Sequence, residues 1–310
     1  MRTRPFGKTG IEVSALGYGA PYLSVHGRPS EQEAVRLVQQ AVTHGVTLID
    51  TADTYCLGPW DLHHNERLVM RAIHGQADGL RDLLVATKGG AVRAVQGWEI
   101  DGRPERLYQA ICDSHAALGG DAPISLWQHH WPDPRYSIRA MLAPVQRAVE
   151  QGLVRLVGVA NYTVEQLQQA REMLDVVSVQ NQYNLWHREA EQDGMLEYCE
   201  REGLVFMPWR PMGGPGLAHR LAEIEPLAQI ARDRGISPQR LMMAWHLAKS
   251  PCIIPIVGTK QWNHLKDCLA ADDVKLEPRE MAQLDAIQPG QLAERTRQPA
   301  WEGMPPLAKY

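Results

Sequence analysis

This sequence has little phenylalanine and no paired cysteines. Of its 310 residues only 2 are Phe, whereas 9 are Trp and 9 are Tyr, so tryptophan and tyrosine supply most of the aromatic core. The 5 cysteines are scattered and form no Cys-x-x-Cys pair. An odd, dispersed set favours reduced thiols in a cytosolic protein over a disulfide framework.

Runs of one charge and long apolar runs are also missing. Lys and Arg number 32 against 36 Asp and Glu, and the net charge of -4 is spread along the chain, which gives no basic stripe for nucleic acid or for a membrane surface. The N-terminus lacks the apolar core of a signal peptide, and the apolar run Cys252–Val257 is too short to cross a bilayer. We expect a soluble, cytoplasmic protein. No feature indicates its oligomeric state.

What the sequence does contain is a repeated unit of a short apolar run, a turn and an amphipathic helix. Capping boxes at Ser30–Glu33 and Thr163–Gln166 predict helices to about His44 and Leu174, and Ser237-Pro238 opens another. The apolar runs are Val13–Leu16, Val46–Ile49, Leu83–Ala86, Ile124–Trp127, Val154–Val159, Val176–Val179, Leu204–Met207 and Ile253–Val257.

Nearly continuous apolar strands that alternate with helices indicate a parallel sheet covered on both faces. At this length, we predict an α/β fold of the (β/α)8 TIM-barrel class. A doubly wound sheet is the alternative, but Gly17-Tyr-Gly19 is a poor match to its glycine-rich turn. No linker divides the chain, so residues 1–310 are predicted to form one barrel domain, with 289–310 as a C-terminal tail or loop over the barrel mouth.

Ionisable residues follow three consecutive apolar runs, at the strand ends where barrel chemistry collects. They are Asp50, with Tyr55 close behind it, Lys88, and the pair His129-His130. A lysine beside a phenol lowers the phenol's pKa, and a carboxylate keeps that lysine charged. Such a tyrosine can protonate a carbonyl oxygen while a neutral histidine orients the substrate. None of these groups is a reductant, so the set points to carbonyl reduction by a bound hydride donor.

The segments around these residues resemble the aldo-keto reductase family. The similarity lies in Gly45–Tyr55 (GVTLIDTADTY), Leu84–Gly90 (LVATKGG) and Gln128–Asp133 (QHHWPD), and it runs from about Arg4 to Ile287. The resemblance implies an NADPH-dependent reductase of aldehydes or ketones, able to run backwards as an alcohol dehydrogenase. It implies the catalytic residues Asp50, Tyr55, Lys88 and His130, with Tyr55 as the proton donor.

The same resemblance implies where the cofactor binds. Asn161 and Gln180 would hold the nicotinamide carboxamide, Trp209 would stack on its ring, and the glycine-rich loop after Trp209 would wrap the pyrophosphate. The segment after the last strand would bind the adenosine 2′-phosphate, which favours NADPH and leaves NADH as the alternative. The implied residues are Asn161, Gln180, Trp209, Arg210, Pro211, Gly213, Gly214, Gly216, Gly258, Thr259, Lys260 and His264. The chain departs from the family at Ala160, where serine is usual, and at Cys268, where asparagine is common.

Several residues allow other interpretations. His63-His64 and His129-His130 lack a ligand set with metal spacing, so no metal is predicted. Trp131 and, more weakly, Tyr22 are expected on the substrate wall. Trp60 is a further tryptophan at a candidate mouth position.

A non-catalytic NADP(H)-binding sensor or regulatory subunit is the alternative function, and a metal-dependent hydrolase is a weaker one. All four catalytic residues are present, which favours the enzyme with a small-molecule carbonyl substrate.

Overall fold

A sheet of eight parallel strands forms the centre of the protein. The computed structural model describes residues 1–74, 83–95 and 97–287. The strand order is β11-β10-β9-β8-β5-β4-β3-β12. Their bounds are β3 Gly17–Gly19, β4 Leu48–Asp50, β5 Leu84–Gly89, β8 Leu126–His129, β9 Val157–Ala160, β10 Val176–Gln180, β11 Val205–Phe206 and β12 Ile256–Gly258.

The two outer strands of this order are joined to each other. Phe206 and Ile253 form a parallel bridge. The amide of Phe206 donates to the carbonyl of Cys252, and the amide of Ile254 donates back to the carbonyl of Phe206. The sheet therefore closes into a barrel, and the predicted (β/α)8 class is confirmed.

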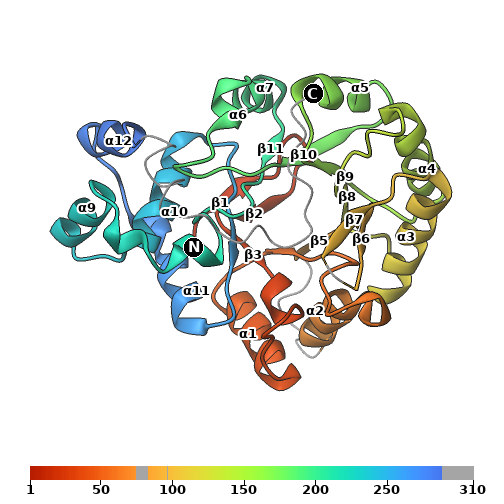
Figure 1. Cartoon of the computed structure of the whole chain (residues 1–310), viewed down its shortest axis with the longest axis horizontal. Coiled ribbons are helices and arrows are strands. Elements are labelled where there is room, and N and C mark those ends of the chain that lie inside the picture. Colours follow the sequence, from red (N-terminus) through yellow and green to blue (C-terminus); the bar gives the residue numbers. More distant parts are fainter. Residues whose placement is uncertain (75–82, 96, 288–310) are drawn as a thin grey trace.

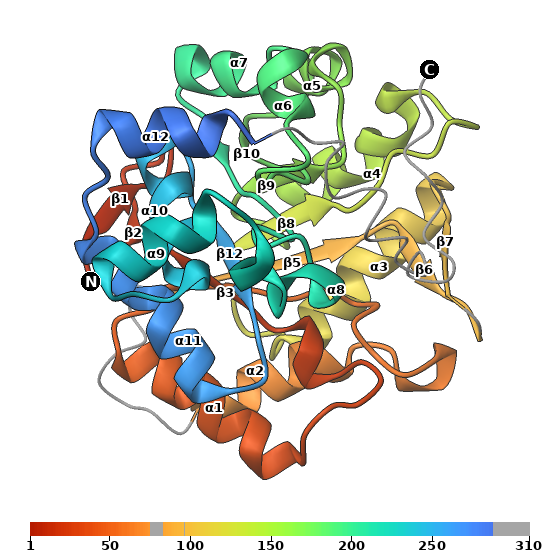
Figure 2. The same cartoon turned by 60° about the vertical axis from the view of Figure 1, so that its left-hand side comes forward.

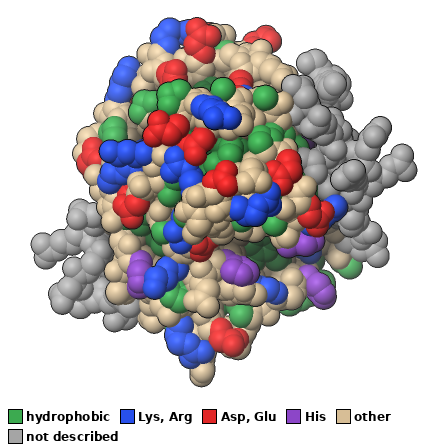
Figure 3. Space-filling model, turned by 90° about the vertical axis from the view of Figure 1, so that its left-hand side faces the viewer, with side chains coloured by type: hydrophobic (Ala, Val, Ile, Leu, Met, Phe, Trp, Pro, Cys, Tyr) green, Lys and Arg blue, Asp and Glu red, His purple; other side chains and the backbone are tan. Residues whose placement is uncertain are grey.

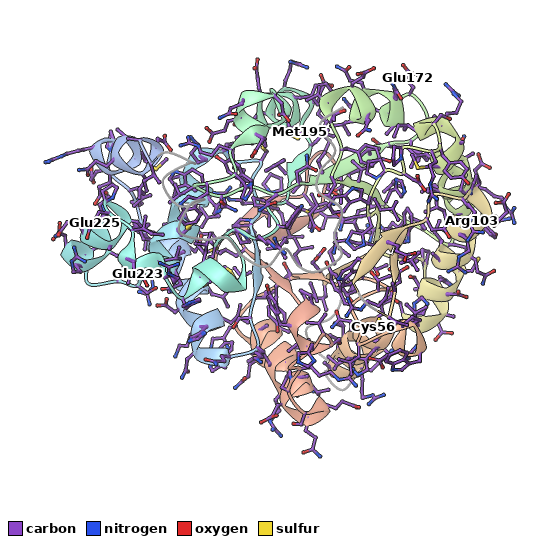
Figure 4. The ribbon with its side chains drawn as sticks, viewed as in Figure 1. Cys56, Arg103, Glu172, Met195, Glu223 and Glu225 are labelled. Atoms are coloured by element: carbon purple, nitrogen blue, oxygen red, sulfur yellow. The ribbon has the colours of Figure 1, made fainter. Side chains whose placement is uncertain are left out.

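Helices surround the barrel as an outer layer (Figure 1). They are α1 Glu31–Thr43, α2 His64–His74, α3 Pro104–Ala117, α4 Ile138–Glu150, α5 Val164–Arg171, α6 Glu189–Gln192, α7 Met195–Glu202, α8 Pro215–Ala218, α9 Leu227–Arg234, α10 Pro238–Lys249, α11 Trp262–Leu269 and α12 Pro278–Asp285. Short 3-10 helices are η1 Pro21–Leu23, η2 Pro59–Asp61, η3 Leu221–Glu223 and η4 Ala270–Asp273. Glu223 and Glu225, between α8 and α9, lie at the periphery (Figure 4).

Local capping fixes where the helices begin. Ser30 and Thr163 form the capping boxes expected at the starts of α1 and α5, and Ser237 caps α10. Helix α5 ends at Arg171, three residues before the expected end at Leu174. The starts follow local rules because a side-chain oxygen satisfies free backbone amides within one turn.

Strand residues alternate between the barrel interior and the helix layer. Leu48, Leu84 and Leu126 pack in the interior cluster, whereas Ile49, Val85 and Trp127 pack in the cluster that includes the helices. The period of two brings the next interior positions, Asp50 and Gln128, to the end of their strands. Alternation therefore carries polar side chains into the upper barrel while keeping its base apolar.

The first predicted strand is wrong in position. Val13–Leu16 is not the first barrel strand: it begins in β2 (Glu12–Ser14), which pairs antiparallel with β1 (Thr3–Pro5) in an N-terminal hairpin. The run is apolar because Val13 and Phe6 pack into the barrel interior. The first barrel strand is the glycine-containing β3 that follows.

A second hairpin lies beyond β5. Strands β6 (Ala91–Arg93) and β7 (Trp98–Ile100) pair antiparallel and project from the barrel beside α3 (Figure 2). Arg103 at the start of α3 lies at the edge of the molecule (Figure 4). The predicted tail, 289–310, lies outside the described residues.

The surface matches the even charge distribution of the sequence. On the face seen in Figure 3, acidic and basic side chains are intermixed. Among the described residues, no helix combines the length and apolarity that a membrane span needs.

Candidate active site

A pocket of about 340 Å³ opens at the carboxyl ends of the strands. All four predicted catalytic positions meet there: Asp50, Tyr55 and His130 line the pocket, and Lys88 lies beneath them in contact with two of the three. Tyr22 and Trp131, the expected substrate wall, line it too.

Lys88 is the centre of this constellation. Its side chain is 0% exposed and rises from β5. The Nζ atom donates to Asp50 Oδ2 at 2.6 Å, to the Thr51 carbonyl at 2.9 Å and to the Tyr55 hydroxyl at 3.0 Å. An ammonium group has three donors, so every one is engaged, and the phenol of Tyr55 lies next to a fixed positive charge.

Burial and charge decide the protonation states. Burial raises the pKa of Tyr55, and the opposing effect of Lys88 is smaller, so the phenol is protonated at neutral pH. Burial would lower the pKa of Lys88, but Asp50 and Tyr55 together raise it above its ordinary value. The expected lowering of the Tyr55 pKa by Lys88 is thus present, and burial outweighs it.

Two amide side chains hold the other oxygen of Asp50. Gln180 donates to Oδ1 at 3.0 Å and Gln128 at 3.3 Å. Gln128 lies close to β9, where a Cβ on Gly158 would be 3.0 Å from Gln128 Cγ and 2.4 Å from Ser178 Oγ. The glycine therefore allows Gln128 and Ser178 to approach β9 closely.

His130 faces Tyr55 across the pocket. The two rings have centroids 6.1 Å apart at an angle of 83°, and burial holds the pKa of His130 well below its usual range. Among the described residues, its Nδ1 has no hydrogen-bond partner. Asn161 donates to the His130 carbonyl at 2.9 Å and accepts from the Trp209 indole at 3.0 Å. A neutral imidazole and a phenol thus face one space.

The adjacent histidine, His129, points the other way. Its Nδ1 lies 2.6 Å from the Tyr162 hydroxyl, and its ring stacks on Trp127 in the helix-facing layer. The pair is therefore split between the two faces of β8, as alternation requires. Among the residues that the structure describes, no group of three or more His, Cys, Asp or Glu could hold a metal ion.

The model of the Aldo/keto reductase family matches residues 15–289 of the chain. The chain belongs to this family. It is an oxidoreductase, as the resemblance of its motifs implied.

Known relatives agree with this membership. Pyridoxine 4-dehydrogenase of Escherichia coli is 32% identical over 286 residues, which cover 89% of this chain and 95% of that protein. A thermostable aldo-keto reductase crystallised with the inhibitor epalrestat superposes with a TM-score of 0.78 at 29% identity, covering 93% of this chain and 100% of the other. An aldo/keto reductase of Klebsiella pneumoniae in complex with NADP and acetate has the same fold, with a TM-score of 0.77 at 24% identity. The match covers 93% of this chain and 96% of the other.

The pocket is lined by most of the residues to which the resemblance assigned cofactor binding. Gly213 and Gly216 do not line it: they lie in the turn into α8 and within it. Gly214 lines the pocket with φ of +85°, a backbone conformation that favours glycine. The residues on the wall are Asn161, Gln180, Trp209, Arg210, Pro211, Gly214, Gly258, Thr259, Lys260 and His264.

Several residues that line the pocket were not singled out individually from the sequence. Trp98 on β7 lines the wall and meets Tyr55 edge-on, with ring centroids 6.2 Å apart. Val25, His26 and Met212 also line it. The period of two along β8 could have placed Gln128 inside, but nothing in the sequence marks the hairpin that carries Trp98. Trp60 does not line the pocket and is 73% exposed.

Proposed function

We propose that this protein reduces the carbonyl group of an aldehyde or ketone, using NADPH, with Tyr55 as proton donor. The observation that supports this most strongly is the contact of the Lys88 ammonium with both Asp50 and Tyr55, beneath a pocket that His130 faces. Bound NADPH would supply the hydride, which no side chain can provide.

Tyr55 suits the role of an acid. It is protonated at neutral pH because burial raises its pKa. When it gives its proton to the carbonyl oxygen, the phenolate forms 3.0 Å from the Lys88 ammonium, which stabilises the new charge. Asp50 keeps that ammonium charged and in place through the 2.6 Å ion pair.

His130 suits the role of a neutral hydrogen-bond donor. Burial keeps its pKa well below neutral, so the imidazole carries one proton and no charge. A neutral imidazole can orient the carbonyl oxygen through a hydrogen bond, while Tyr55 remains the group that donates the proton. In the reverse direction the same groups would oxidise an alcohol, with Tyr55 accepting the proton.

The pocket residues fit NADPH. Gly258 has no room for a side chain, since a Cβ there would lie 2.8 Å from the Tyr22 ring. Lys260, His264 and Arg210 place nitrogen donors along the wall that would receive the phosphates. Asn161 already has protein partners for both ends of its amide, so it would serve the nicotinamide by exchanging one of them.

The substrate wall indicates which carbonyl compounds to test. Trp98, Trp131 and Tyr22 line the pocket and suit a flat, ring-bearing aldehyde. Because the chain is related to pyridoxine 4-dehydrogenase, we include pyridoxal, the aldehyde that corresponds to pyridoxine, among the compounds to test.

The test follows NADPH oxidation at 340 nm with pyridoxal, benzaldehyde and short aliphatic aldehydes, for the wild type, Tyr55→Phe and Tyr108→Phe. Tyr108 bonds Gln151 on the surface and is the control for loss of a phenol. We expect turnover to fall about 10²-fold or more in Tyr55→Phe and to stay unchanged in Tyr108→Phe. Fluorescence titration should show that Tyr55→Phe still binds NADPH. NADPH binding without any turnover would support the sensor or subunit instead.

A further inference from the structure

The loop that carries Tyr55 rests on the first turn of α2. The amide of His63 donates to the Asp53 carbonyl at 2.8 Å, and the Thr51 hydroxyl donates to Asn65 Oδ1 at 2.6 Å. The amide of Asp53 itself donates to the Lys88 carbonyl at 3.2 Å. This loop is therefore held between β5 and α2, directly behind the proton donor. Cys56, the next residue after Tyr55, lies within the body of the molecule (Figure 4).

Two buried carboxyl groups, those of Asp53 and Glu66, belong to this loop and to the first turn of α2. Glu66 is fully buried, accepting from the Thr87 hydroxyl at 2.5 Å and lying 2.6 Å from His63 Nδ1. Thr87 precedes Lys88, so the cluster abuts the opposite face of β5. Asp53 is 6% exposed, and its Oδ1 has no hydrogen-bond partner among the described residues.

We propose that Asp53 is a positioning residue that sets the acidity of Tyr55 through its charge in the cluster formed with Glu66 and His63. This inference rests on the proposed role of Tyr55 as proton donor. With Asp53 neutral, the charges that act on the phenol are those of Lys88 and Asp50. An ionised Asp53 adds a negative charge behind the phenol, making phenolate harder to form.

The surroundings favour the neutral form of Asp53 at physiological pH. Burial, aided by the negative charge of Glu66, raises the pKa of Asp53 to about 8, against a smaller lowering by His63. Burial would lower the pKa of His63, but the bond to Glu66 and the charges of Glu66 and Asp53 raise it overall.

Several charged or titratable groups interact with this cluster or with Tyr55. Tyr55 and Cys56 come from the same loop, Lys88 from β5 and Asp50 from β4. Asp113 on α3 acts on His63. Ionisation of Asp53 raises the pKa of Tyr55, because a negative charge near the phenol disfavours the phenolate.

The decisive variant is Asp53→Asn, which keeps the size of the protonated side chain and removes the titration. We would titrate Tyr55 in the cofactor-free protein by phenolate absorbance at 295 nm, taking the difference from Tyr55→Phe. In the wild type, Asp53 is already ionised when Tyr55 titrates. Asp53→Asn should therefore lower the Tyr55 midpoint by about one pH unit. Asp272→Asn is the control, because Asp272 is 5% exposed and pairs with Arg2, away from the pocket.

Kinetics provide the second readout. As Asp53 ionises near pH 8, kcat/KM for reduction should fall about threefold in the wild type because Tyr55 becomes a weaker acid. Asp53→Asn should remove this step, and Glu66→Gln should move it to lower pH because one negative charge next to Asp53 is gone.

Stability gives an independent check on the raised pKa of Asp53. A carboxyl whose pKa rises on folding destabilises the fold as pH rises from its ordinary 3.8 towards 8, so Asp53→Asn should unfold at a higher temperature than the wild type above pH 8. An unchanged Tyr55 midpoint together with an unchanged kinetic step would overturn the proposal. Absence of turnover in the wild type would instead refute the proposed function, and the 295 nm titration would still test Asp53.

Discussion

At the scale of single residues, the Lys88–Asp50 pair carries both stability and activity. Lys88→Met would leave the Asp50 carboxylate buried without its cation, which costs about 3–5 kcal/mol in the free energy of unfolding. Adding Asp50→Asn removes that charge, so the double variant should regain most of the stability yet stay inactive. Urea unfolding and NADPH turnover check both parts. A double variant no more stable than Lys88→Met would show that charge burial is not the cause.

The sequence predicted these residues better than their neighbours, for a physical reason. Asp50, Lys88 and His130 lie at or next to the ends of neighbouring strands of one parallel sheet, and such ends meet at one edge. Burial of Tyr55 could not be judged without the surrounding loops, so the net direction of its pKa was missed. Trp98 was missed because its hairpin has no motif.

At the scale of elements, helix starts were predictable and the first strand was not. Capping depends on residues within one turn, as at Ser30 and Thr163. An apolar run shows only that a segment is buried, and Val13 is buried in a hairpin at the barrel base instead of in a barrel strand. Burial alone does not distinguish the two.

The loop after β12 gives a prediction on cofactor choice. Lys260 lies on the pocket wall, and its Nζ donates to the Gly27 carbonyl at 2.7 Å. If it binds the 2′-phosphate, Lys260→Ala should weaken NADPH binding about tenfold, equivalent to about 1.4 kcal/mol, and leave NADH binding unchanged. Fluorescence titration with both cofactors measures this, with Lys275→Ala, an exposed lysine away from the pocket, as control. Equal weakening of both cofactors would exclude a 2′-phosphate contact.

At the scale of the whole molecule, stability and chemistry occupy opposite ends of the barrel. The N-terminal hairpin packs Phe6 and Val13 into the barrel interior against Leu48 and Leu84, which begin their strands, whereas the pocket lies at the carboxyl ends. Arg4 fastens this hairpin to the segment before β12, with bonds of 2.7–2.8 Å to the carbonyls of Leu247, Ser250 and Ile253. The base should therefore tolerate changes that leave the mouth intact.

Arg4→Ala tests this separation. Loss of three charge-assisted hydrogen bonds should lower the free energy of unfolding by about 2–3 kcal/mol, and Tm by about 3–5 °C. The value of kcat/KM at 25 °C should stay within about twofold of the wild type, because the three residues that Arg4 bonds do not line the pocket. Arg36→Ala, an exposed arginine on α1, should change neither quantity. A large loss of turnover in Arg4→Ala at a temperature where the variant is fully folded would show that the base and the mouth are energetically coupled.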